Sequence, residues 1–99
     1  MDDIAFSDAT SLVARIKSKE ISSLELLEHY LLRIEKHNPS INAVIAMQVE
    51  QATERAKAAD RALAKGEDWG PLHGLPMTVK ESFKMEGMPT TWGDPAYKD

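Results

Sequence analysis

One lysine in the sequence stands where it could act as a base. Lys80 closes a short apolar run at 77–79, and loops rich in glycine and proline lie on both sides of it. A lysine held at the end of an apolar strand is partly desolvated, and desolvation lowers the pKa of the amine by up to about 3 to 5 units from its reference of about 10.4. A neutral lysine amine can accept a proton, as a general base must. The alternative is a lysine whose amine simply reaches water from the strand end.

Other catalytic and ligand-binding patterns are missing. The chain has no cysteine, which excludes disulfides, thiolate zinc sites, iron–sulfur clusters and cysteine nucleophiles. No two histidines have the i, i+4 spacing that turns two imidazoles toward one metal, so we expect them on the surface or in loops; they are His29, His37 and His73. Serine-hydrolase, phosphate-loop and dinucleotide fingerprints are also missing. We therefore predict no metal and no cofactor.

Composition and charge favour one small cytoplasmic domain. The 99 residues are 42% hydrophobic and 28% charged, which argues against a disordered chain. Twelve basic and sixteen acidic residues give a net charge of -4, which offers no electrostatic footprint for a nucleic acid. No apolar stretch approaches the roughly 18 to 20 residues needed to cross a bilayer, and the N-terminus does not resemble a secretory signal. We predict neither a nucleic-acid partner nor a membrane partner.

Three segments have the apolar spacing of amphipathic helices, at about 8–19, 23–37 and 49–65. We expect Ser7 to cap the first of them. The third is rich in alanine and stops at Gly66, and its small-residue face should pack closely on a larger neighbour.

The second helix has the clearest boundary signals. Ser22 and Glu25 form a capping box, in which the serine oxygen accepts the Glu25 amide while the glutamate carboxylate reaches back to the Ser22 amide. Asn38 should end this helix, because Pro39 follows it and a residue before proline avoids the helical conformation.

Two short segments are predicted to be strands, at about 41–47 and 77–80, because their residues are mostly β-branched, apolar or small. The stretch 66–76 between the third helix and the second strand contains too many glycines and prolines for a regular element. The predicted fold class is therefore α/β within a single unit, 1–99, in which N-terminal helices precede the first strands of an incomplete sheet.

The sequence around Lys80 closely resembles the lysine segment of the amidase signature family. The resemblance rests on G-P-L-H-G-L-P-M-T-V-K-E at 70–81 and G-M-P-T-T-W-G at 87–93. The helices upstream and the phrase I-N-A-V at 41–44 are also similar to that family's N-terminal region, so the resemblance covers essentially the whole chain. It implies the family's mixed sheet and its activity, which is hydrolysis of a carboxylic amide through a Ser-cis-Ser-Lys triad. Lys80 matches the lysine of the family's G-x-P-x-x-V-K run, and the resemblance implies that it is catalytic.

Two departures from the family pattern matter. Glu81 stands where the family often has aspartate, which keeps a carboxylate beside the lysine. The glycine- and serine-rich segment that supplies the two serines is not in the sequence, and neither Ser40 nor Ser82 lies in such a context. We therefore expect an N-terminal fragment of a longer enzyme that acts on a small-molecule amide. Alone, the fragment should be inactive and should self-associate through unpaired strand edges and uncovered apolar surface.

Two other functions stay open. The helices could form a non-catalytic interaction or assembly module that merely retains the lysine segment, and a G-G-S-S-G-G-like run in a longer reading frame would argue against this. The chain could also belong to the amidotransferase type of the same family, the subunit which delivers ammonia to a mischarged tRNA. The acidic charge gives no footprint for tRNA, and T-T-W-G at 90–93 looks more like the free-standing amidases. The sequence does not identify the amide substrate.

Overall fold

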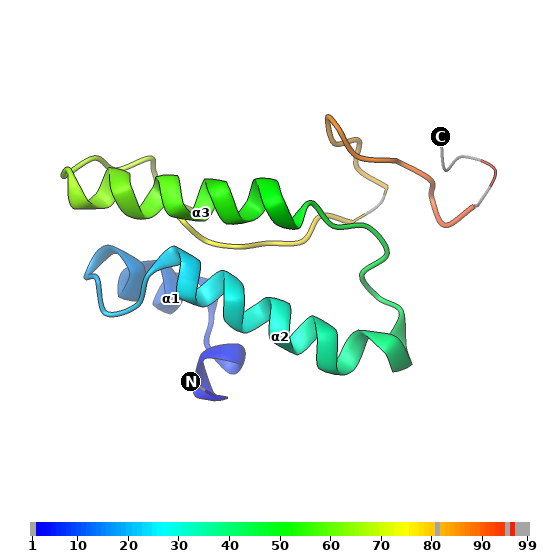
Figure 1. Ribbon diagram of the computed structural model, residues 1–99, viewed down its shortest axis with the longest axis horizontal. Helices are drawn as coiled ribbons and strands as arrows, with labels where there is room; N and C mark the ends of the chain where they lie inside the picture. Colours follow the sequence, from blue (N-terminus) through cyan, green and yellow to red (C-terminus); the bar gives the residue numbers. More distant parts are fainter. Residues whose placement is uncertain (1, 81, 95, 97–99) are drawn as a thin grey trace.

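The computed structural model describes residues 2–80, 82–94 and 96. Its elements are a short 3-10 helix, η1 (Asp2–Phe6), followed by three α-helices, α1 (Ala9–Lys17), α2 (Ser23–Ile41) and α3 (Val49–Ala64). Helices α2 and α3 lie side by side and run in opposite directions, with α1 beside the start of α2 (Figure 1). After α3 the chain turns back and runs between α2 and α3. None of the described helices is long and apolar enough to span a bilayer.

The core is built by the N-terminal half of the chain. Aliphatic side chains from η1, α1, the following turn and α2 are buried together; they are Ile4, Leu12, Ile16, Ile21 and Leu26. Leu63 of α3 and Leu75 of the returning chain pack against this cluster. The small-residue face of α3 is buried at Ala56, Ala59 and Ala62, so that α3 can approach α2 and the returning segment closely.

Helix α1 is capped by Asp8 rather than by Ser7, so the predicted cap was off by one residue. The Asp8 carboxylate accepts a hydrogen bond from the amide of Ser11 at 2.7 Å, which satisfies one of the free amides of the first turn. The helix ends at Lys17, earlier than the predicted limit near 19, where Lys19 takes a positive φ of 65°. A residue in the left-handed region cannot continue a right-handed helix.

The capping box at the start of α2 is confirmed. The Glu25 amide donates to the Ser22 hydroxyl oxygen at 3.0 Å, and the Ser22 amide donates to the Glu25 carboxylate at 3.1 Å. This signal could be read from sequence because all of its groups lie within one turn.

The predicted end of α2 at Asn38 is wrong, because the helix continues through Pro39 to Ile41. Proline removes one backbone donor, and the last turn is closed instead by the Asn42 amide, which donates to the Asn38 carbonyl oxygen at 2.6 Å. Asn42 has a φ of 54° in the left-handed region, where asparagine is tolerated. The helix therefore stops at a left-handed cap beyond the proline.

The α/β prediction is also wrong, since none of the residues 2–80, 82–94 and 96 forms a strand. In the segment predicted at 41–47, the Asn38 side-chain amide bonds both backbone groups of Val44, accepting from its N–H at 2.9 Å and donating to its C=O at 2.8 Å. The segment predicted at 77–80 is exposed and has no regular hydrogen bonding. Strands are held by the ladder of a neighbouring strand, and the described part of the chain provides none.

Candidate functional site

Lys80 lies in an exposed, irregular segment after the returning turn. Its neighbours Met77 and Val79 are exposed as well, at 65% and 43%. The Lys80 carbonyl oxygen accepts a hydrogen bond from the Phe83 amide at 3.0 Å, which closes a turn directly after the lysine. The apolar strand end that the sequence predicted for Lys80 is therefore not formed by these residues. Glu81, the predicted neighbouring carboxylate, lies outside the described residues.

The segment that leads to Lys80 is attached to α2 through one short contact. The Ser23 side chain is only 2% exposed, and its hydroxyl donates a hydrogen bond to the Gly74 carbonyl oxygen at 2.6 Å. Gly74 has a φ of 75°, and a Cβ there would lie 3.1 Å from the Ser23 Cβ and 3.4 Å from the Ile16 Cγ2. Only glycine fits this conformation and this close approach without displacing its neighbours.

His73 attaches the same turn to α3. Its ring is 3% exposed, with Nε2 at 2.8 Å from the Ala59 carbonyl oxygen and Nδ1 accepting the Trp69 amide at 2.9 Å. Because Nδ1 accepts, Nε2 must carry the hydrogen that it donates to Ala59. The ring also packs on Trp69, with centroids 4.9 Å apart, and the Arg55 guanidinium lies 4.1 Å from the Trp69 ring centroid. The sequence placed His73 correctly in a loop but did not reveal its burial.

Asp60 connects α3 to the first turn of α2. One carboxylate oxygen accepts the Ser23 amide at 2.7 Å, and the other accepts the Leu24 amide at 3.1 Å. A carboxylate is favourable there because helix N-terminal amides lack partners within the helix and carry partial positive charge. Sequence analysis missed Asp60, because this contact joins segments far apart along the chain.

Asp68 joins the start of the turn to α1. Its carboxylate accepts the Gly70 amide at 2.8 Å and pairs with the Lys17 ammonium at 3.1 Å. The hydrogen bond from Gly70, followed by the one from Lys17, lowers the pKa of Asp68 from its ordinary value of 3.8. Since both interactions favour the ionised carboxylate, they hold the loop to the helical layer at neutral pH.

A contact beyond the lysine attaches the chain to the other end of α3. The Gln48 side-chain amide donates to the Gly87 carbonyl oxygen at 3.0 Å. Lys80 thus lies between two anchored positions, Gly74 on α2 and Gly87 at the residue that precedes α3.

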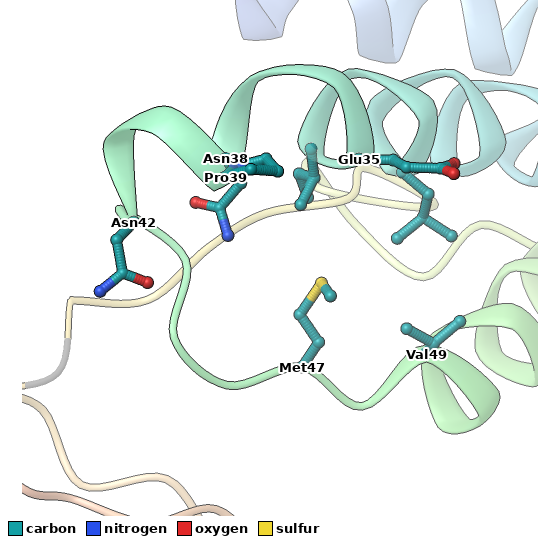
Figure 2. Close-up of a pocket in the computed structure, with 8 residues that line it drawn as sticks. Glu35, Asn38, Pro39, Asn42, Met47 and Val49 are labelled. Atoms are coloured by element: carbon teal, nitrogen blue, oxygen red, sulfur yellow. The ribbon is translucent and has the colours of Figure 1, made fainter.

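A groove away from Lys80 lies between the end of α2, the linker and the start of α3 (Figure 2). Most of its lining is apolar, and the Met47 side chain points toward α2. The lining residues are Leu31, Ile34, Glu35, Asn38, Pro39, Asn42, Met47 and Val49. Glu35 is the one carboxylate among them, so this groove does not present the pair of titratable groups that acid–base catalysis uses.

The remaining candidates are dispersed. Ser40 is exposed in the last turn of α2, where its hydroxyl donates to the His37 carbonyl oxygen at 3.1 Å, and Ser82 follows the lysine segment. Over the described ranges, no three histidine, aspartate or glutamate side chains gather as metal ligands. The structure therefore offers Lys80 and the contacts that anchor its segment, without a second catalytic group beside it in the described residues.

Comparison with known proteins gives this segment a context. The family described as Amidase matches residues 25–99. An acylamidase of Rhodococcus erythropolis is 40% identical over 86% of this chain and 18% of its own length. An indoleacetamide hydrolase of Bradyrhizobium diazoefficiens is 43% identical over 92% of this chain and 17% of its own. One subunit of the glutamyl-tRNA(Gln) amidotransferase of Methylobacillus flagellatus is 46% identical over 83% and 16%. The chain thus spans less than a fifth of the length of these relatives.

Proposed function

Because the chain belongs to the Amidase family, we propose that Lys80 is the lysine of a Ser-cis-Ser-Lys triad in a longer amide hydrolase. The observation that carries the proposal is the run from Gly74 to Lys80, whose glycine, proline, valine and lysine match the family's lysine motif within the matched region. The two serines belong to sequence outside these 99 residues.

In this mechanism Lys80 acts as the base. Its neutral amine accepts the proton of the cis-serine hydroxyl while that hydroxyl takes the proton of the nucleophilic serine. The serine oxygen then attacks the amide carbonyl carbon, and the tetrahedral intermediate carries its charge on the former carbonyl oxygen. Collapse breaks the C–N bond, the protons return to the departing amine or ammonia, and water hydrolyses the acyl-enzyme to the acid.

The exposure of Lys80 in this chain supports such a role. Its segment is anchored on the helices at Gly74 while the lysine itself projects from an exposed stretch. An amine placed in this way is accessible to groups supplied by the rest of a longer protein. Burial between those groups would remove water from the amine, and desolvation favours its neutral form.

We propose a small-molecule amide as the substrate, with no cofactor, no nucleic-acid partner and no membrane partner. The absence of cysteine and the acidic charge support a cytoplasmic protein with this chemistry. The 99 residues alone should not hydrolyse amides, because they lack the serine-rich segment.

The direct test is an assay of the full-length protein encoded by the longer reading frame. Incubation with arylamides, aliphatic amides and peptide amides should release acid and amine in equal amounts, as measured by mass spectrometry. The amidotransferase alternative has its own support, since one relative bearing that name is 46% identical to the chain. Glutamine-dependent transfer of ammonia to a mischarged tRNA, without turnover of simple amides, would favour that alternative. Absence of both activities would contradict the proposal.

A further inference from the structure

We infer that Ser23, Asp60 and His73 are positioning residues for Lys80, because together they fix the turn that leads to it on two helices. We call these three side chains the clamp. The inference rests on the proposed role of Lys80 and assigns a function to side chains that contribute no catalytic group themselves.

The clamp fixes the turn in three directions. Ser23 holds the Gly74 carbonyl oxygen at 2.6 Å, and His73 spans from the Trp69 amide to the Ala59 carbonyl oxygen. Asp60 binds the Ser23 backbone amide at 2.7 Å, so the residue that holds the turn is itself held by α3. A turn attached to both helices cannot slide along one of them without breaking a bond to the other.

All three contacts are shielded from water. Ser23 and His73 are 2% and 3% exposed, and Asp60 is partly buried. Breaking a buried hydrogen bond leaves an unsatisfied polar group, which costs more free energy than breaking an exposed one. The contacts therefore define the direction in which the chain leaves Gly74.

That direction matters at Lys80 because the intervening segment acts as a lever. Residues 75–80 can span at most about 20 Å when extended, and Pro76 restricts their backbone. A rotation of a few degrees at Gly74 would therefore move the lysine by about 1 Å or more. Misplacing a catalytic group by about 1 Å can cost about 100-fold in rate.

The test compares two glycine substitutions in the full-length enzyme. Gly74→Ala and Gly66→Ala both place a side chain at a positive φ, of 75° and 82°, but a Cβ at Gly66 meets nothing within 4 Å. The backbone strain is therefore similar, and only Gly74→Ala pushes against Ser23. We expect Gly74→Ala to lower kcat by about 10- to 100-fold with KM changed less than about threefold. Gly66→Ala should leave both within about threefold of wild type.

A second series varies the donor on the other side of the contact. Ser23→Ala removes the hydroxyl, whereas Ser23→Cys keeps a side chain of similar size with a weaker donor. We expect kcat to fall in the order serine, cysteine, alanine. The control is Val13→Ala, which opens a gap at a buried α1 side chain outside the clamp. It should destabilise the enzyme toward heat without lowering kcat at a temperature where the enzyme remains folded.

Reactivity of the nucleophile separates positioning from a general loss of structure. A sulfonyl fluoride labels an activated serine without turnover, so its labelling rate should fall in parallel with kcat in Gly74→Ala and Ser23→Ala. Equal kcat values for Gly74→Ala and Gly66→Ala would overturn the inference. So would loss of kcat in Val13→Ala to the same degree as in Ser23→Ala. If Lys80→Ala itself retains full activity, the proposed function fails, whereas an inactive Lys80→Ala beside fully active clamp variants refutes the positioning role alone.

Discussion

The imidazole of His73 places Nε2 at 2.8 Å from the carbonyl oxygen of Ala59, in a ring that is almost completely buried. This bond joins the turn before Lys80 to the small-residue face of α3. An alanine at 59 leaves room for the ring to approach the helix backbone. The alanine-rich composition of α3 therefore serves the attachment of the lysine segment as well as the packing of the helices.

The tautomer of His73 is a direct prediction of this geometry. At an alkaline pH, where imidazoles are neutral, the hydrogen should reside on Nε2, because Nδ1 accepts the Trp69 amide. The nitrogen chemical shifts of the His73 ring, measured by NMR on the 99-residue chain, distinguish the two tautomers. The more exposed His37 serves as the reference within the same sample. A hydrogen on Nδ1 would contradict the described arrangement.

Removing the Asp60 carboxylate should loosen the start of α2. In Asp60→Ala, the Ser23 and Leu24 amides lose their acceptor, and hydrogen bonds to a charged group contribute about 1.5 to 3 kcal/mol. We expect both amides to exchange with solvent faster and the free energy of unfolding to fall by about 1 to 3 kcal/mol.

Hydrogen exchange and chemical denaturation check the Asp60 prediction. The matched control is Glu54→Ala, which removes an exposed α3 carboxylate paired with Lys57 at 3.5 Å. Such an exposed pair contributes at most about 0.5 kcal/mol. Equal effects of the two substitutions would show that Asp60 does not cap α2.

The sequence predicts those parts of the fold that depend on neighbouring residues. The capping box at Ser22 and Glu25 and the existence of three helices follow from spacing within single turns. The end of α2 does not, because the loss of a donor at Pro39 was compensated by the left-handed cap at Asn42.

Features that depend on distant contacts were not predictable in the same way. A strand requires a neighbouring chain segment, and Val44 instead bonds to the Asn38 side chain. The burial of His73 depends on how α3 packs, and Asp60 acts on residues of α2. Lys80 was identified from its motif alone. The contacts that anchor its segment could be recognised only in the structure.

The low pKa of Asp68 gives a pH dependence with a defined sign. Its carboxylate is stabilised in the folded chain, so its contribution to stability is fully present above the ordinary value of 3.8 and is lost as the pH falls through the lower, folded pKa. An NMR titration of this carboxyl should show a midpoint below 3.8. In Lys17→Met the midpoint should rise yet stay below 3.8, because the Gly70 amide is the larger cause. A wild-type midpoint at or above 3.8 would contradict both contacts.

Self-association of the 99-residue chain remains a prediction, although its basis changes. Strand edges are not formed in the described residues, but Met77 and Phe83 are exposed at 65% and 66%. Contiguous exposed apolar side chains favour association, so we expect at least a dimer at high micromolar concentration in analytical ultracentrifugation.

Substitution of those side chains tests the source of the association. Met77→Ser combined with Phe83→Ser should shift the chain toward monomer. Phe6→Ser is the control, because Phe6 is also exposed but lies in η1 with the Arg33 guanidinium 5.4 Å from its ring centroid. A wild-type chain that sediments purely as a folded monomer would refute the prediction.

The central claim is that Lys80 supplies the base of an amide hydrolase, and the measurement that tests it is kcat for amide hydrolysis by Lys80 variants of the full-length enzyme. Lys80→Ala should lower kcat by at least about 100-fold, since general-base catalysis contributes about 100- to 10,000-fold. Lys80→Arg should be nearly as inactive, because a guanidinium stays protonated at any working pH. Lys84→Ala, which removes another exposed lysine nearby, should stay within about threefold of wild type. A Lys80→Ala enzyme that turns over within about tenfold of wild type would contradict the account.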